Sequence, residues 1–445
     1  MNYLAYEMAH AWVTPWRWGM QSLKHTLDSP FNPWGQTPVA RNMAAGCELF
    51  ENMTRRYGKP EWGIDATQIH GLTVPVCEEA TLCKRFGNLI HFKRDEAVVG
   101  RRFDPKVLII APMSGHHATL LRSTVEAMIP EHEVYVTDWT DARMVPDAAG
   151  TFDLDDFIDY IIEFIQYIGS NTHVMAVCQP AVPALAATAL MAARDDACQP
   201  TSLTLMGGPI DTRRNPTVVN ELAEERPIEW FENTVISHVP APNPGFLRKV
   251  YPGFVQLTGF MTMNLERHVS AHEELFHHLV AGDDSSAQQT QEFYEEYLSV
   301  MDLTAEFYLQ TVKTVFKDHA LPKGEMVHRN ERVDCSAITN TAIMTVEGEN
   351  DDICGLGQTE AALDLCSGVP DDEKYHYVQA GVGHYGVFNG KRWRTEIQPR
   401  IREFIRTIQF KRQMGDRESS FGLPYRSLTD EREPEADWET NGFTS

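Results

Sequence analysis

The sequence has no surplus of basic residues. Its 445 residues include 39 Lys and Arg against 63 Asp and Glu, a formal net charge of −24 at pH 7. Nucleic acid and anionic lipid both require a basic protein surface, so neither is an expected partner. The sequence also has no run of 18 apolar residues, so no membrane-spanning helix is expected.

Cysteine is sparse, and its spacing follows no pattern. The eight cysteines are scattered and none forms a CxxC motif. The first residues lack a basic segment, and Glu7 and His10 interrupt their apolar run, so no secretory signal is expected. We therefore expect a cytoplasmic protein whose cysteines remain free thiols.

Motifs for metals and phosphates are also missing. The pair His272 and His277 is similar to a zinc motif, but the histidines are five residues apart instead of four and do not share a helix face. Gly355-Leu-Gly357 lacks the lysine of a phosphate loop. No metal and no organic cofactor are expected.

Strand and helix patterns alternate from residue 106 onward. Buried strands are predicted at 106–111, 134–139, 173–177 and 202–206, with helices over 119–128, 152–168 and 181–193. This alternation predicts an α/β fold with a mainly parallel sheet covered on both faces. The predicted organisation is N-terminal helices and antiparallel strands over 1–100, a core over 101–212 and 337–412, an inserted helical cap over 213–336 with a long helix at 288–316, and a disordered tail over 413–445.

The first 62 residues are helical in pattern and rich in aromatic residues. The group includes Trp12, Trp16, Trp18, Phe31 and Trp34. The ordinary interpretation is a helical layer packed on the core. The alternative is an apolar surface that docks on something hydrophobic. Past this segment, residues 64–83 alternate and include a His70-Gly71 turn, which indicates a hairpin.

One strand runs directly into one helix at Cys178. The sequence there is Ala176-Val-Cys178-Gln-Pro180, and Pro180 suits the first turn of a helix. A sharp turn of this kind is the nucleophile elbow of hydrolases, written G-x-S-x-G. Here cysteine replaces serine and neither flanking glycine is present, so a buried packing cysteine is the competing interpretation.

Two later loops supply partners for a nucleophile. Val346-Glu-Gly-Glu-Asn-Asp351-Asp352 follows one predicted strand, and a glycine-rich loop with His384 follows the next. Nucleophile, acid and histidine in this chain order are typical of the α/β-hydrolase fold. In such a triad the histidine acts as base and the carboxylate fixes its tautomer.

The loop after residue 111 is the candidate for an oxyanion hole. Backbone N–H groups of Met113 or Ser114, together with that of Gln179, could hold the developing negative charge. His116 and His117 are better explained as polar anchors of this loop than as a base. Ser114 is the rival nucleophile, but no helix-opening turn surrounds it.

Several motifs along the chain resemble the intracellular polyhydroxyalkanoate (polyhydroxybutyrate) depolymerases. The resemblance spans roughly residues 1–410. The motifs are Ala111-Pro-Met-Ser-Gly-His-His-Ala-Thr-Leu-Leu-Arg122, Val136-Thr-Asp-Trp-Thr-Asp-Ala-Arg-Met-Val-Pro146, Val177-Cys-Gln-Pro180, Met206-Gly-Gly-Pro-Ile-Asp211, Val346-Glu-Gly-Glu-Asn-Asp-Asp-Ile353 and Gly383-His-Tyr-Gly386.

The resemblance implies a capped α/β hydrolase that attacks amorphous polyester granules in the cytoplasm. It implies Cys178 as nucleophile, Asp351 as acid, in preference to Asp352, and His384 as base. It also implies ester hydrolysis without a cofactor. Two alternatives stay open: a polyhydroxyalkanoate synthase-like acyltransferase, whose glycine-flanked cysteine box is absent here, and a non-catalytic granule protein. The oligomeric state stays open as well.

Overall fold

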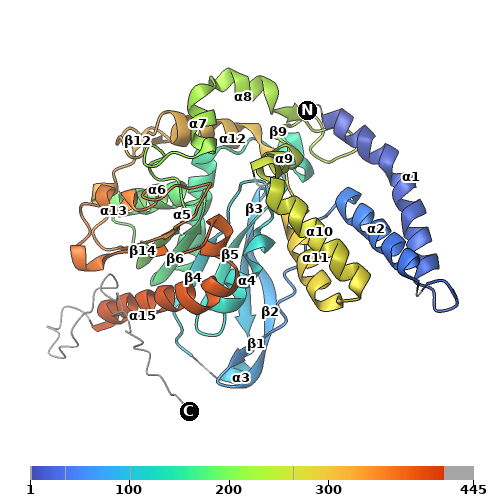
Figure 1. Ribbon diagram of the computed structural model, residues 1–445. Coiled ribbons are helices and arrows are strands. Elements are labelled where there is room, and N and C mark those ends of the chain that lie inside the picture. The colour runs from blue at the N-terminus through green and yellow to red at the C-terminus, as the bar shows by residue number, and fades with distance from the viewer. Residues whose placement is uncertain (1–2, 36, 101, 264, 415–445) are drawn as a thin grey trace, which may run out of the picture.

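A nine-stranded sheet forms the centre of the molecule (Figure 1). The computed structural model describes residues 3–35, 37–100, 102–263 and 265–414. The strand order is β1-β2-β3-β5-β4-β6-β7-β13-β14. The strands are β1 (Ala66–Ile69), β2 (Leu72–Cys83), β3 (Gly87–Arg94), β4 (Lys106–Ile110), β5 (Glu133–Trp139), β6 (Thr172–Val177), β7 (Ser202–Met206), β13 (Ala342–Gly348) and β14 (Lys374–Gln379).

The sheet is parallel from β5 to β14 and antiparallel at its other end. β1, β2 and β3 form an antiparallel meander, and β3 pairs antiparallel with β5. Every residue of β6, β7 and β13 is buried, because helices cover both faces of the parallel part. The topology confirms the predicted α/β-hydrolase class, and the turn between β1 and β2 falls at His70 and Gly71 as expected.

Helices pack on both faces of the parallel strands. α5 (Leu154–Ile168) and α6 (Ala181–Ala193) pack together, and a capping box of Asp153 and Asp156 begins α5. α4 (Arg122–Met128) and α15 (Gln398–Met414) form the other layer, where His173 of β6 hydrogen bonds Gln409 at 2.9 Å. The remaining short helices of the core are α3 (Glu96–Val99), α13 (Ala361–Leu365) and α14 (Gly390–Arg392).

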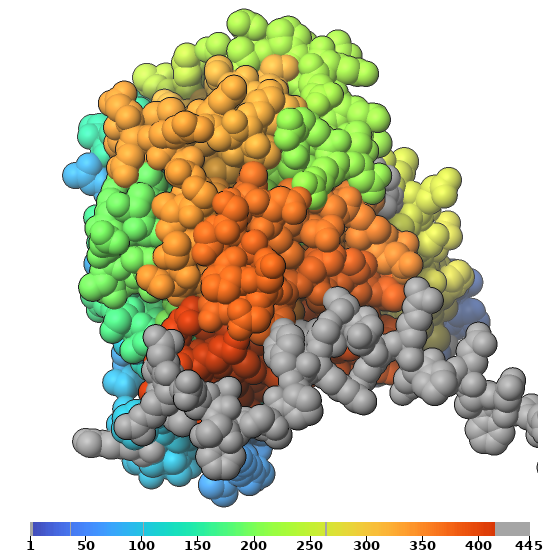
Figure 2. All heavy atoms as spheres, turned by 90° about the vertical axis from the view of Figure 1, so that its left-hand side faces the viewer, coloured from blue at the N-terminus to red at the C-terminus, as the bar shows by residue number. Residues whose placement is uncertain are grey.

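The segment between β7 and β13 is mainly helical and lies above the carboxyl edge of the sheet (Figures 1 and 2). Seen from the side opposite α1, its green and orange parts form the top of the molecule (Figure 2). Its elements are α7 (Val218–Glu225), α8 (Ile228–Thr234), β8 (Ser237–His238), β9 (Lys249–Tyr251), α9 (Gly253–Met263), α10 (Leu265–Ala281), α11 (Asp284–Leu298), β10 (Leu303–Thr304), α12 (Ala305–Thr311), β11 (Val327–His328) and β12 (Glu331–Arg332).

The long helix expected over 288–316 is wrong. α11 ends at Leu298, and β10 then pairs antiparallel with β9 before α12 begins. Two tertiary contacts cause the break. The Met301 N–H donates to Gly115 O at 2.7 Å, and the Asp302 N–H donates to Asp141 Oδ1 at 3.1 Å. These contacts outweigh the helical periodicity of the segment.

The N-terminal residues form two helices, α1 (Tyr3–Leu27) and α2 (Pro38–Thr54). A packed helical layer is the wrong interpretation of α1, because Tyr3 is the one residue that α1 buries among its described positions. No helix in the described part of the chain is long and apolar enough to cross a membrane. The tail predicted to be disordered lies, beyond residue 414, outside the described residues.

Candidate active site

Cys178 occupies a strained turn between β6 and α6. Its backbone φ is +66°, a left-handed conformation that costs a residue with a side chain about 1–3 kcal/mol. Its N–H donates to Met206 O at 2.8 Å, and its carbonyl accepts from Ala181 N at 3.0 Å. These bonds hold the turn in the shape of a nucleophile elbow, with a half-buried thiol at its apex.

Glycines on the adjacent loop make room for this elbow. A Cβ atom at Gly208 would lie 2.1 Å from Ala181 Cβ and 3.0 Å from Cys178 O. A Cβ atom at Gly207 would lie 3.3 Å from His384 Cε1. In the usual elbow, flanking glycines let neighbouring backbone approach the turn closely. Here Gly207 and Gly208, which follow β7, allow this close approach.

Asp351 and His384 form a buried pair. His384 Nδ1 lies 2.8 Å from Asp351 Oδ2, and the two side chains are 5% and 1% exposed. Asp351 Oδ1 accepts backbone hydrogen bonds from Ile353 at 2.9 Å and Cys354 at 2.8 Å. Both carboxylate oxygens of Asp351 therefore take part in hydrogen bonds. The second imidazole nitrogen of His384 is left to bond with Cys178.

The electrostatics of His384 depend on both neighbours. Burial acts to lower the pKa of His384, but the charges of Cys178 and Asp351 and hydrogen bonds to both outweigh it, so the pKa is raised well above 6.5. The structure therefore brings Cys178, Asp351 and His384 together at the carboxyl ends of β6, β13 and β14.

The loop after β4 meets the elbow. The Met113 N–H points at Gln179 Oε1 at 3.4 Å, so these two residues lie side by side, and Ser114 next to them is half-buried. The Gln179 side chain thus occupies the position in which the Met113 N–H could bind the carbonyl oxygen of an ester.

His116 and His117 are buried beside this loop. His116 Nε2 lies 3.1 Å from Tyr297 O, and the ring stacks on Phe260. Burial lowers the pKa of His116 to about 4 and that of His117 to about 3, so both are neutral at pH 7. The contacts of His116 fix the loop against α11.

A second buried carboxylate, Glu347, orders the loop that follows Asp351. It accepts backbone N–H bonds from Gly357 at 2.9 Å and Thr359 at 2.7 Å. Thr359 Oγ1 in turn accepts from Gly208 N at 2.8 Å and donates to Gly208 O at 3.0 Å. Sequence reasoning missed Glu347 and Thr359. The available signal was an acidic residue inside an otherwise apolar strand.

The described residues contain no group of three or more His, Cys, Asp or Glu side chains that could hold a metal ion. The eight cysteines are all free thiols.

Residues 207–409 match the family model described as PHB de-polymerase C-terminus. The chain carries a PHB depolymerase domain. It is an ester hydrolase with an α/β-hydrolase fold. The PHB depolymerase domain begins at Gly207, one residue after β7, and includes Asp351 and His384, whereas Cys178 precedes it.

No curated protein matches the chain. Solved structures with a similar fold include a 2-hydroxy-6-oxo-6-phenylhexa-2,4-dienoate hydrolase from Rhodococcus sp. strain RHA1, with 11% identity, coverage of 75% of this chain and 100% of that chain, and a TM-score of 0.41. A monoacylglycerol lipase from Paleococcus ferrophilus has 12% identity, coverage of 68% and 96%, and a TM-score of 0.39. A thermophilic esterase from Thermogutta terrifontis has 12% identity, coverage of 78% and 97%, and a TM-score of 0.37. At these scores the matches bear on neither substrate nor mechanism.

Proposed function

We propose that this protein hydrolyses the ester bonds of poly(3-hydroxybutyrate) and related polyhydroxyalkanoates in cytoplasmic granules, through a Cys178–His384–Asp351 triad. The observation that carries the proposal is the buried Asp351–His384 pair set against a cysteine on a strained elbow, in a chain with a PHB depolymerase domain. The products are 3-hydroxy acids or short oligomers.

The first half of the reaction transfers an acyl group to sulfur. The Cys178 thiolate attacks the ester carbonyl carbon, and the π electrons move to the carbonyl oxygen. Backbone N–H groups of Met113 or Ser114, with that of Gln179, receive this oxyanion once the Gln179 side chain has moved aside. The intermediate collapses, the C–O bond breaks, and the leaving alkoxide takes a proton from the His384 imidazolium. A thioester and a free hydroxyl chain end result.

The second half releases the acid. Neutral His384 removes a proton from a water molecule, whose oxygen attacks the thioester carbon. Collapse of this second tetrahedral intermediate breaks the C–S bond and releases the carboxylic acid, leaving the thiolate beside the imidazolium. Asp351 accepts the Nδ1–H of His384 and so holds the imidazole in that tautomer. With water as the second substrate, the residues of this chain therefore suffice for the whole catalytic cycle.

Release of 3-hydroxybutyrate from amorphous granules tests this function. The purified protein is expected to release the acid from granules with no added thioester. The yield of 3-hydroxybutyrate should not change when 3-hydroxybutyryl-CoA is supplied. Consumption of the CoA thioester with polymer growth would instead identify an acyltransferase, and binding to granules without release of acid would identify a non-catalytic granule protein.

We expect the reagent sensitivity of a thiol enzyme. The proposed nucleophile is a sulfur atom that lies beside the His384 imidazole and at the start of α6. Iodoacetamide should therefore inactivate the protein in step with alkylation of Cys178, and fluorophosphonates, which react with activated serine hydroxyls, should not.

Mass mapping separates Cys178 from the other thiols. Cys77 and Cys83 are exposed and will also react, but their alkylation should not track loss of activity. Inactivation should slow sharply in His384→Ala. Stoichiometric fluorophosphonate labelling of Ser114, with activity lost in parallel, would show that the nucleophile has been assigned to the wrong loop.

A further inference from the structure

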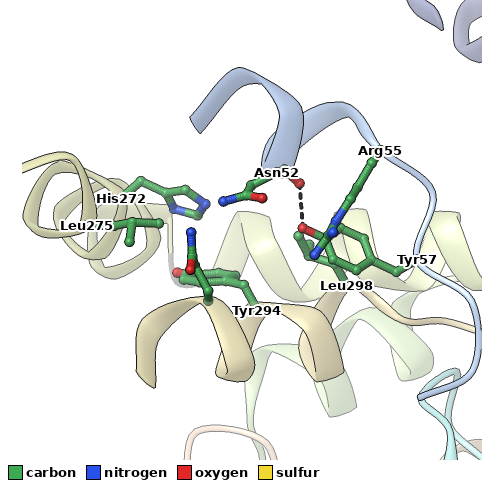
Figure 3. Close-up of a pocket in the computed structure, with 8 residues that line it drawn as sticks. Asn52, Arg55, Tyr57, His272, Leu275, Tyr294 and Leu298 are labelled. Atoms are coloured by element: carbon green, nitrogen blue, oxygen red, sulfur yellow. Dashed lines mark hydrogen bonds between the residues drawn. The ribbon is translucent and has the colours of Figure 1, made fainter. Parts of the chain in front are cut away.

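The helices α1 and α2 form an arm, residues 3–54, at the side of the molecule away from α5 and α6 (Figure 1). α1 packs on α2, and α2 packs on α10. Gln291 of α11 donates to Glu48 at 2.7 Å, and Arg55 pairs with Glu295. Figure 3 shows the end of α2 facing α10 and α11, with Asn52 beside His272 and Tyr294. One side of α1 is therefore held, and its outer side has no protein layer over it.

The outer face of α1 is apolar and exposed. Trp12 is 72% exposed, Trp16 59% and Trp18 64%. Met8, Trp12 and Trp16 follow each other at four-residue spacing, so they line one side of the helix. The apolar surface continues through the turn to α2. We define the outer face by the exposed apolar side chains of this side and of the turn, Met8, Trp12, Trp16, Leu23, Phe31 and Trp34, together with Trp18 at the flank of the helix.

The part of this outer face that runs from Met8 to Leu23 carries no charged side chain. Up to Leu23, the charged residues of α1 are Glu7 and Arg17, and both are half-buried on the side that faces α2. Glu7 pairs with Arg56, and Arg17 donates to Thr54 O at 2.7 Å. An uncharged aromatic surface of this size on a chain of net charge −24 marks an interaction site rather than ordinary surface.

We propose that the outer face of α1 docks the enzyme on the surface of amorphous polyester, a partner that rests on the function proposed above. Such a surface is uncharged, so it does not repel an acidic protein. It offers methyl and methylene groups to the indole rings, and ester carbonyl oxygens to the indole N–H groups. Binding to an anionic lipid surface would require exposed Lys or Arg beside the apolar stripe, and between Met8 and Leu23 the one basic residue, Arg17, is turned toward α2.

The arm is attached to helices that border the candidate triad. The Tyr297 carbonyl oxygen of α11 accepts from His116 Nε2 at 3.1 Å. The Tyr297 ring centroid lies 5.9 Å from that of Tyr385, which follows His384. Contact of the arm with polymer therefore keeps α11 and the carboxyl edge of the sheet close to the same surface.

Co-sedimentation with amorphous poly(3-hydroxybutyrate) granules tests the proposal. All proteins carry Cys178→Ala so that the granules are not consumed. The test variant adds Trp12→Gln, Trp16→Gln and Trp18→Gln. The matched control adds Phe103→Gln, Phe246→Gln and Phe410→Gln, three exposed aromatic residues outside the arm. We expect the test variant to bind granules at least tenfold more weakly, while the control binds as the parent does.

The tryptophan variant is also made with Cys178 intact, and its hydrolysis of p-nitrophenyl butyrate should stay within twofold of that of the wild-type protein.

Unchanged granule binding by the tryptophan variant that carries Cys178→Ala contradicts the proposal. So does loss of its helical circular dichroism signal, which would show that the tryptophans serve packing. Equal binding of the parent to anionic vesicles would favour a lipid partner, and a dimer that the substitutions convert to a monomer without loss of granule binding would favour a second copy. A wild-type protein, with Cys178 intact, that binds granules but releases no 3-hydroxybutyrate contradicts the proposed function and leaves docking intact.

Discussion

Replacement of Cys178 with alanine is expected to reduce ester hydrolysis by a factor on the order of 10⁶, the scale seen when a triad loses its nucleophile. The reason is that Cys178 places its thiol on an elbow beside His384, which is paired with Asp351. Initial rates with p-nitrophenyl butyrate and with amorphous granules measure the loss.

The fold should survive this substitution. Cys178 is half-buried, and alanine removes one sulfur atom, so we expect the free energy of unfolding to change by less than about 1 kcal/mol. Cys198→Ala is the matched control, because Cys198 is also a half-buried free thiol and lies outside the candidate site. An active Cys178→Ala together with an inactive Ser114→Ala would overturn the assignment.

Local patterns predicted the core of the molecule well. The helix expected over 181–193 is α6, and the strand expected over 202–206 is β7, with the same bounds. β7 is buried throughout and α6 is buried from Ala181 to Ala192, and their apolar runs are short and bounded by turn residues. The carboxyl ends of parallel strands share one sheet edge, so the chain order of Cys178, Asp351 and His384 was enough to predict their proximity.

Long-range contacts account for what the sequence did not reveal. The break after α11 depends on Gly115 and Asp141, which are more than 150 residues away in the chain. The sequence left open whether the α1 tryptophans pack on the core or stay exposed as a docking surface, because an amphipathic pattern does not state which of its faces finds a partner. The bond between Thr359 and Gly208 joins two loops that have no shared local signal.

Asp351→Asn is expected to cost roughly 10⁴-fold in turnover, whereas Asp352→Asn is expected to cost little. Asp351 is the carboxylate that accepts the bond from His384 Nδ1 at 2.8 Å. An amide there favours the wrong imidazole tautomer. The neighbouring substitution makes the same chemical change one residue away, so it controls for loss of charge near the site. Equal and small effects of both substitutions would contradict the triad.

The pH profile gives this prediction a second readout. In the native site the pKa of His384 is raised above 6.5, because the charges of Cys178 and Asp351 outweigh burial. The imidazolium that protonates the leaving alkoxide is therefore present below that raised pKa, and activity is lost as the pH rises through it. Asp351→Asn removes one of the two charges and lowers the pKa, so its remaining activity should decline at a lower pH than that of the wild type. An alkaline limb that stays in place in Asp351→Asn would show that Asp351 does not control the charge of His384.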